Sequence, residues 1–267
     1  MANARIYLTG RVAIEHGERL VAEGAFPGRQ GRLAFAFLTA TSGRPVSRGE
    51  LMDVIWPDEP PPEAESALSA ILSKLRAVLK SAGWSSSAAS IEARSGSLAM
   101  RFPSGTWIDI QAAANAIDEA QGALRSGRAA AAWGCANVVV SITRRPFLTG
   151  HEEPWAVGQR TLLRTLLRRG LECLAAVSVS NDEPALAVQY LTEVRAIEPF
   201  RETTYQQLMR LHAGMGNRAE ALRVFDECRR LLRDELGASP SPQTEAIFLA
   251  ILRDGTPSHR GIETKLK

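Results

Sequence analysis

The sequence predicts two domains of different class, a small α+β domain followed by an all-α domain. In roughly the first hundred residues, short strand-like segments precede three helical segments and a hairpin, whereas almost every segment after Asp109 has helical periodicity. Near the C-terminus, apolar and small residues repeat with a spacing of 34 residues. A chain of 267 residues is long enough for two domains of ordinary size, each with its own core.

Three short segments near the N-terminus are predicted to be strands, at residues 6–9, 12–14 and 20–22. Gly10 separates the first two, and a turn centred on Gly17 separates the second from the third. Glycine at such positions is typical of tight turns between strands. We therefore expect a small antiparallel sheet at the start of the chain.

Two helices are predicted after this sheet. From Arg29 the apolar residues recur with helical period up to a turn at residues 42–45. Ser47 is then a suitable N-cap, because Glu50 follows three residues later and can complete a capping box. The second helix is expected to end at Pro57.

Residues 57–62 are predicted to form a stiff acidic loop. Four of these six residues are prolines, which lack a backbone donor and restrict the residue before them, while Asp58 and Glu59 carry negative charge. Pro61 or Pro62 is suited to the first turn of the helix that follows.

Residues 65–80 carry two stripes at helical spacing. One stripe is apolar and is predicted to be buried; it consists of Leu68, Ile71, Leu72, Leu75, Val78 and Leu79. The other is cationic and hydroxyl-bearing; it consists of Ser69, Ser73, Arg76 and Lys80, with Lys74 beside it. Such side chains donate to phosphates and base acceptors, which is typical of a helix in the DNA major groove. A solvated amphipathic helix has the same pattern, so the segment alone leaves both interpretations open.

Residues 91–101 are predicted to form a hairpin that turns at Gly96. The side chains expected to point inward are Ile91, Ala93, Leu98 and Met100. Arg94 and Arg101 are expected to project outward. The full order of elements is that of a winged helix-turn-helix with an added N-terminal sheet, in which the third helix enters the major groove and the hairpin contacts an adjacent groove or the phosphates.

Positive charge is concentrated near the third helix. Residues 69–101 contain five Lys or Arg against a single acid, Glu92, whereas the whole chain has a net charge of only +3. The overall charge is too small to indicate nucleic-acid binding by itself, so the local cluster is the relevant observation.

The second domain is predicted to be an array of paired helices. Helices are expected at residues 110–124 and 128–140, followed by a long helix through Trp155 to Leu174. Positions 171, 174, 175, 187 and 191 are apolar or small, and so are the positions 34 residues later, which is the tetratricopeptide pattern. Four tryptophans are expected to pack in cores or between domains: Trp56, Trp107, Trp133 and Trp155.

No motif predicts catalysis, a cofactor or a metal site, so an enzyme is not expected. A phosphate-binding GxxxxGK[ST] loop is absent, and the three cysteines and four histidines do not form clusters with ligand spacing. No segment predicts export or a membrane span, and widely spaced cysteines suit a reducing compartment, so a cytoplasmic protein is expected.

The sequence resembles the SARP family of bacterial antibiotic-regulatory transcription activators over nearly its whole length. The N-terminal resemblance lies in Gly43-Arg-Pro-Val-Ser47, in Leu51-Met-Asp-Val-Ile-Trp56 with its proline loop, and in Ala67-Leu68 leading to Leu75-Arg76. The C-terminal resemblance lies in Pro199-Phe-Arg-Glu202, Leu208-Met209, Gly216 to Leu222, Arg229 to Gly237 and Pro240-Ser-Pro242.

The resemblance implies a winged-helix DNA-binding domain at residues 1–105, a tetratricopeptide-like bacterial transcriptional activation domain at 106–253, and a flexible tail at 254–267. It implies binding to promoter DNA at direct repeats as a side-by-side pair, and recruitment of RNA polymerase. Carried over by position, the DNA contacts of the third helix are Ser69, Ser73, Lys74, Arg76 and Lys80. Arg94 is a further expected DNA contact, from its place in the hairpin. Asp58 and Glu59 are the implied polymerase contacts. The alternative is an interaction or ligand-sensing scaffold with a weakened winged helix.

Overall fold

The computed structural model describes residues 4–84, 89–94 and 96–254, and its chain divides into two compact units. The first unit is Met1–Gly170 and the second is Leu171–Lys267. The division lies within one long helix, α6 (Pro154–Ser180). It differs from the domains predicted at residues 1–105 and 106–253, and those bounds remain a prediction. Of the tail predicted at residues 254–267, everything after Asp254 lies outside the described residues.

The predicted N-terminal sheet is confirmed and has one additional strand. β1 (Ala4–Tyr7), β2 (Ala13–His16) and β3 (Arg19–Val21) are antiparallel, with Ile6 opposite Ile14 and Ile14 opposite Val21. β7 (Trp107–Ile108) pairs in parallel with β1, giving the order β3-β2-β1-β7. This two-residue strand is too short to have a recognisable alternation in the sequence.

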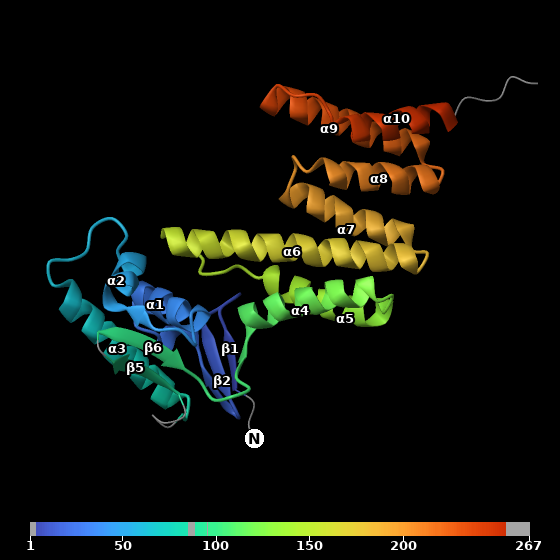
Figure 1. Ribbon diagram of the computed structural model, residues 1–267. Helices are drawn as coiled ribbons and strands as arrows, with labels where there is room; N and C mark the ends of the chain where they lie inside the picture. Colours follow the sequence, from blue (N-terminus) through green and yellow to red (C-terminus); the bar gives the residue numbers. More distant parts are fainter. Residues whose placement is uncertain (1–3, 85–88, 95, 255–267) are drawn as a thin grey trace, which may run out of the picture. The chain divides into compact units, whose positions relative to one another are not determined.

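Three helices and a second sheet complete the winged helix (Figure 1). The helices are α1 (Gly28–Ala40), α2 (Arg48–Ile55) and α3 (Ala64–Ser81), and a short 3₁₀ helix, η1 (Glu23–Ala25), precedes them. β4 (Val46–Ser47), β5 (Ser90–Arg94) and β6 (Ser97–Arg101) form a sheet of order β4-β6-β5. Because β4 pairs with β6, the β5–β6 hairpin is joined to the start of α2.

Three local predictions are corrected in this region. The Ser47 hydroxyl accepts a hydrogen bond from the Glu50 backbone N–H at 2.9 Å, but the Glu50 carboxylate pairs with Arg44 instead of completing a capping box. The prolines at 61 and 62 precede α3 rather than lie in its first turn, because Glu63 is the N-cap. Ala93 is exposed although it was expected to point inward, because it lies near the end of β5, beside the hairpin turn; its ladder partner Leu98 is buried.

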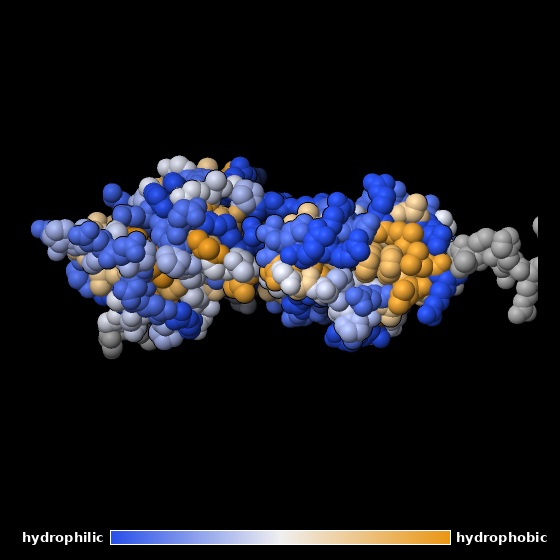
Figure 2. Space-filling view, turned by 90° about the horizontal axis from the view of Figure 1, so that it is seen from above, coloured by the Kyte–Doolittle hydropathy of each residue, from blue (hydrophilic) through white to orange (hydrophobic). Residues whose placement is uncertain are grey.

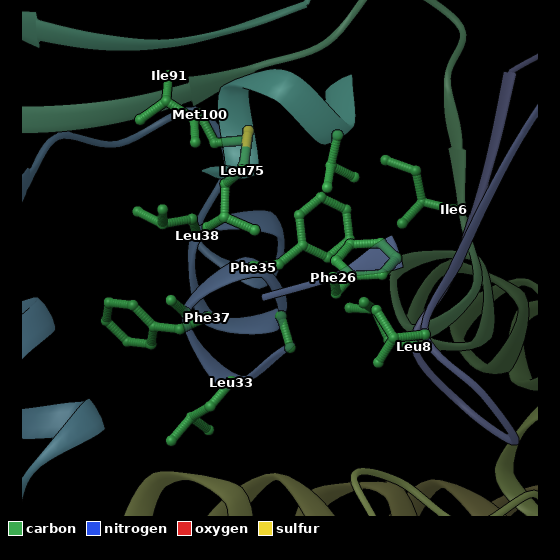
Figure 3. Packing of buried hydrophobic residues seen from close by; sticks show 14 of the residues in the cluster. Ile6, Leu8, Phe26, Leu33, Phe35, Phe37, Leu38, Leu75, Ile91 and Met100 are labelled. Atoms are coloured by element: carbon green, nitrogen blue, oxygen red, sulfur yellow. The ribbon is translucent and has the colours of Figure 1, made fainter. Parts of the chain in front are cut away.

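The core of the first unit is formed by α1 between the sheets and α3 (Figure 3). Leu33, Phe35 and Leu38 of α1 are fully buried, and the Phe35 ring lies 4.8 Å from the ring of Phe26. Leu75 of α3 and Met100 of β6 belong to the same cluster. Burial of large apolar side chains from both sheets and three helices makes these elements a single packed body.

Asp109 connects the helical segment to the N-terminal sheet. It is fully buried at the start of α4 (Asp109–Arg125), and its Oδ2 accepts hydrogen bonds from the backbone N–H groups of Leu8 and Thr9 at 2.9 and 2.8 Å. The Thr9 hydroxyl also donates to Oδ2 at 2.8 Å, and the Ile110 N–H donates to Oδ1 at 2.8 Å. Burial raises the pKa of Asp109, while these hydrogen bonds oppose that shift. The first unit therefore continues past residue 105.

The other helices of the first unit are α5 (Ala129–Thr143) and the first part of α6. Trp155 packs edge-to-face on Phe37, with ring centroids 5.3 Å apart, as expected for a core tryptophan. Trp133 differs from the prediction, because half of its surface is exposed on α5.

The second unit has the predicted 34-residue repeat. After the end of α6 it contains α7 (Pro184–Ile197), α8 (Glu202–Gly214), α9 (Arg218–Leu236) and α10 (Pro242–Asp254). All but one of the residues that mark the repeat are buried: Leu171, Leu174, Ala175, Ala187, Leu191, Tyr205, Leu208, Met209, Ala221, Phe225 and Cys228. The exception is Pro199, which is exposed in the turn after α7. Ala187 and Ala221 are small where paired helices meet, so the helices approach closely. Figure 2 shows an apolar area over α10, where Leu249 is exposed.

Candidate nucleic-acid interface

α3 presents two faces that match the two stripes of its sequence. All six residues of the apolar stripe are buried, from Leu68 at 0% exposed to Ile71 at 8%. All five predicted contact residues of the helix are exposed: Ser69, Ser73, Lys74, Arg76 and Lys80. The packing of the apolar stripe against α1 therefore fixes which side of α3 faces outward.

Arg76 connects α3 to the hairpin. Its Nε and Nη2 both donate to the backbone carbonyl oxygen of Ile91, at 3.2 and 3.1 Å. Ile91 lies in β5, so the guanidinium holds the hairpin beside the exposed face of the helix. A guanidinium has five N–H donors, and these two bonds leave three for other acceptors.

Ser69 is held by an arginine that the sequence reasoning did not select. Arg48, the first residue of α2, donates from Nη2 to the Ser69 hydroxyl at 3.0 Å and from Nε to a Glu65 carboxylate oxygen at 2.8 Å. The Ser69 oxygen is used as an acceptor, so its own O–H remains a donor. The sequence signal for Arg48 is weak, because only the fold brings the start of α2 beside the first turns of α3.

Ser73, Lys74 and Lys80 have no hydrogen bond or ion pair with another described residue in the structure. Lys80 lies in the last turn of α3, where a cation also interacts favourably with the helix dipole. Two ammonium groups and a hydroxyl on one helix therefore face solvent with unused donor capacity.

The hairpin carries further charge beside α3. Arg101 of β6 is exposed and forms an ion pair with Glu92 across the hairpin, with 3.1 Å between Nε and Oε1. Arg94 pairs with Ser97 in the β ladder. The prediction for the Arg94 side chain lies outside what the structure describes, as does Ser95.

Another ion pair lies where the hairpin joins α2. Arg44 donates from Nη1 to Oε2 of Glu50 at 3.2 Å, and the hydrogen bond from Arg44 lowers the pKa of Glu50. The sequence reasoning assigned Glu50 to a capping box and did not consider Arg44.

The loop between α2 and α3 is exposed at both predicted polymerase contacts. Asp58 and Glu59 are exposed, as are Pro57 and Pro60 beside them. The loop thus presents two carboxylates on a segment whose backbone is restricted by prolines.

The two units differ in charge. Residues 1–170 contain 20 Lys or Arg and 15 Asp or Glu, a net charge of +5, whereas residues 171–267 contain 12 and 14, a net charge of −2. Nucleic acid would therefore be attracted to the first unit rather than the second. Within the residues that the structure describes, no helix is both long and apolar enough to span a bilayer.

Comparison with known families identifies the helical part of the chain. Residues 108–252 match the model of the bacterial transcriptional activator domain. The match begins one residue before Asp109 and ends within α10.

Two curated relatives and one solved structure extend the similarity to the N-terminal region. The chain is 29% identical over 249 residues to the regulatory protein AfsR of Streptomyces griseus, and 31% identical over 224 residues to AfsR of Streptomyces coelicolor. These alignments cover 93% and 84% of this chain but only 24% and 22% of the relatives, so the chain spans about a quarter of their length.

The solved structure is Mycobacterium tuberculosis EmbR in complex with a low-affinity phosphopeptide. It matches with a TM-score of 0.82 at 20% identity, over 95% of this chain and 66% of that one. At this identity the similarity establishes the fold, a winged helix followed by tetratricopeptide-like helices.

Proposed function

Because this chain belongs to the bacterial transcriptional activator domain family and is a SARP-type transcriptional regulator, we propose that it binds promoter DNA through α3 and the β5–β6 hairpin and activates transcription. The observation that carries the proposal is the exposed face of α3, where Ser73, Lys74 and Lys80 have unused donors. These groups point away from the buried apolar stripe, as a helix inserted in the major groove requires.

Arg76 has two roles in this proposal. Two of its donors position the hairpin through the Ile91 carbonyl, and the others are available to a phosphate or a base acceptor. The hairpin and the helix would then approach DNA as one rigid surface. Ser69, held by Arg48, contributes a single hydroxyl donor, so most of the affinity is expected from phosphate contacts.

A gel-shift series with the DNA upstream of the protein's own gene tests this assignment. Lys74→Ala and Lys80→Ala are each expected to reduce the slope of log affinity against log salt concentration by about 1, because each removes one phosphate contact. Arg125→Ala is the matched control, since Arg125 is exposed on α4 in the same unit. Unchanged affinity and salt slope in both lysine variants would refute the assignment of α3.

We further propose that the protein binds direct repeats as a side-by-side pair and recruits RNA polymerase through Asp58 and Glu59. Both carboxylates are exposed on the proline loop, at the end of α3 that begins with Ala64. In a reconstituted transcription assay, a combined Asp58→Asn and Glu59→Gln variant is expected to bind DNA normally but to activate less. Glu18→Gln, on the β2–β3 turn, is the control carboxylate. Full activation by the loop variant would refute the contact.

A groove in the second unit favours protein interaction as a second candidate function. It has a volume of about 200 Å³ and is lined by residues of α6, α7 and α8, including Val179, Arg210 and Leu211. Val179 is 52% exposed, which leaves apolar surface available in the groove. DNA binding that is weak, independent of sequence and abolished by moderate salt would favour this function over the first.

A further inference from the structure

The last helix of the second unit, α10, has an apolar side that nothing covers among the described residues. α10 packs against α8 and α9, and no helix follows it in the part of the chain that the structure describes. A helical-repeat array ordinarily ends in a helix with a polar outer face, because no further repeat covers that face. In α10 the outer side contains Ala246, Ala250 and Leu249, and 47% of the Leu249 surface is exposed. Figure 2 shows this apolar area over α10.

Contacts on the opposite side hold α10 in one orientation. Thr244 and Ile251 are buried, and the Phe248 ring stacks on the Phe225 ring with the two centroids 4.0 Å apart. Arg218 of α9 donates from Nε to the Ile251 carbonyl oxygen at 3.0 Å, which fixes the last turn of α10. The outer side is therefore a defined surface with a constant set of exposed residues.

Two opposite charges flank Leu249 at equal spacing on this outer side. Glu245 precedes Leu249 by four residues and Arg253 follows it by four, and both side chains are exposed. Four residues correspond to about 6 Å along a helix axis and a rotation of about 40° around it. Glu245 and Arg253 are therefore displaced from Leu249 by the same amount in opposite directions. The outer side has an apolar centre between one negative and one positive group.

We propose that this side of α10 binds the same side of α10 in a second copy of the chain, in antiparallel orientation about a twofold axis at Leu249. Such an axis reverses both the direction along the helix and the sense of rotation around it. Glu245 of each copy then lies opposite Arg253 of the other, and Ala246 lies opposite Leu252. Leu249 packs against its own counterpart. The contact buries apolar side chains and forms two ion pairs at once.

The charges favour the antiparallel arrangement over a parallel one. Two parallel helices in register would place Glu245 opposite Glu245 and Arg253 opposite Arg253, and both pairs would repel. One helix from each copy forms a small interface, so we expect a weak dimer with a dissociation constant of about 10–100 µM.

This association differs from the side-by-side pair proposed on DNA. Direct repeats hold two DNA-binding domains in the same orientation, whereas the α10 contact relates two second units by a twofold axis. It involves none of the residues assigned above to DNA or polymerase, so the dimer is expected in the absence of DNA and does not depend on the proposed function.

Sedimentation equilibrium of the intact chain without DNA, at concentrations from about 1 to about 500 µM, tests the proposal. A reversible monomer–dimer equilibrium is expected. Leu249→Asp should weaken dimerisation by about tenfold or more, because it places a charge at the centre of the contact. Leu162→Asp is the control, at a leucine of α6 that is 58% exposed, and should dimerise like the unaltered chain. A chain that stays monomeric throughout, or an equally strong dimer in Leu249→Asp, would overturn the proposal.

Charge reversal tests the antiparallel register. Glu245→Arg and Arg253→Glu, each alone, place like charges opposite each other twice in the dimer, so each should weaken dimerisation by about five- to tenfold at low salt. The double variant restores both pairs with reversed sign and should dimerise within about twofold of the unaltered chain. Circular dichroism and urea unfolding show whether each variant is folded. A folded double variant that dimerises no better than the single variants would overturn the proposal.

Discussion

Replacement of Asp109 with alanine is expected to lower the free energy of unfolding of the first unit by about 3–5 kcal/mol. The carboxylate accepts hydrogen bonds from three backbone N–H groups, of Leu8, Thr9 and Ile110, and from the Thr9 hydroxyl. A buried donor left without an acceptor costs about 1–3 kcal/mol, so four donors sum to about 4–12 kcal/mol, and partial relaxation at the start of α4 brings the expected loss to the bottom of that range or slightly below it. For a unit of this size, the unfolding midpoint should fall by about 10 °C.

Tryptophan fluorescence isolates this effect, because all five tryptophans of the chain lie in residues 1–170. Thermal and urea unfolding followed by this signal therefore report on the first unit within the intact protein. Asp109→Asn, which keeps one acceptor oxygen and the volume, should lose about 1–2 kcal/mol, and Thr9→Val about 1 kcal/mol. A loss below about 1 kcal/mol in Asp109→Ala would refute the view that these donors depend on the carboxylate.

Three further predictions address packing, pH and the hairpin. Gly170→Ala in α6 should lower the free energy of unfolding by about 1 kcal/mol, because the added Cβ would lie 3.0 Å from a Val140 methyl carbon. Gly158→Ala in the same helix is the control: its added Cβ meets no atom within 4 Å, so it should raise the free energy of unfolding by about 0.5–1 kcal/mol. Urea unfolding measures both. The Glu202 carboxylate is partly buried, which raises its pKa, but hydrogen bonds from Thr244 and Ser241 outweigh this and hold the pKa below its usual value. The ionised carboxylate therefore contributes stability above its unfolded pKa near 4.5, and this contribution is lost as the pH falls through the lower folded pKa. Hydrogen exchange in α8 and α10 should become faster as the pH falls through this range, beyond the intrinsic effect of pH, and this acid dependence should be absent in Glu202→Gln. Arg76→Lys should release the hairpin, because an ammonium group cannot make both hydrogen bonds to the Ile91 carbonyl oxygen. Hydrogen exchange of the β5 amides should become faster while that of α1 stays the same. Unchanged hydrogen exchange in β5 would contradict the role of the Ile91 contact.

Much of the candidate interface could be predicted because α3 encodes it locally. The spacing of Leu68, Leu72 and Leu75 determines a buried side, and the same spacing then determines that Ser73 and Lys80 face away from the core. The 34-residue repeat is equally local, since the same small and apolar positions recur in each helix pair.

The interactions that the sequence reasoning missed join residues far apart in the chain. The contacts of Arg48 with Ser69, of Arg76 with Ile91 and of Asp109 with Thr9 each depend on how separate elements pack. Periodicity describes which side of one element is buried but carries no information about the partner of an exposed or polar side chain.

The sequence by itself determined the first three strands, the three helices, the hairpin, the two faces of α3 and the repeat, because each follows from residue spacing within a segment, whereas the two-residue strands β4 and β7 were not predicted. Only the tertiary structure decided where the first unit ends. The domain boundary expected at residue 105 remains a prediction, whereas β7 and Asp109 attach the following helix to the N-terminal sheet and its adjoining residues through hydrogen bonds that span about a hundred residues of sequence. A buried carboxylate acquires its partners from the fold, so the position of this connection was set by tertiary packing.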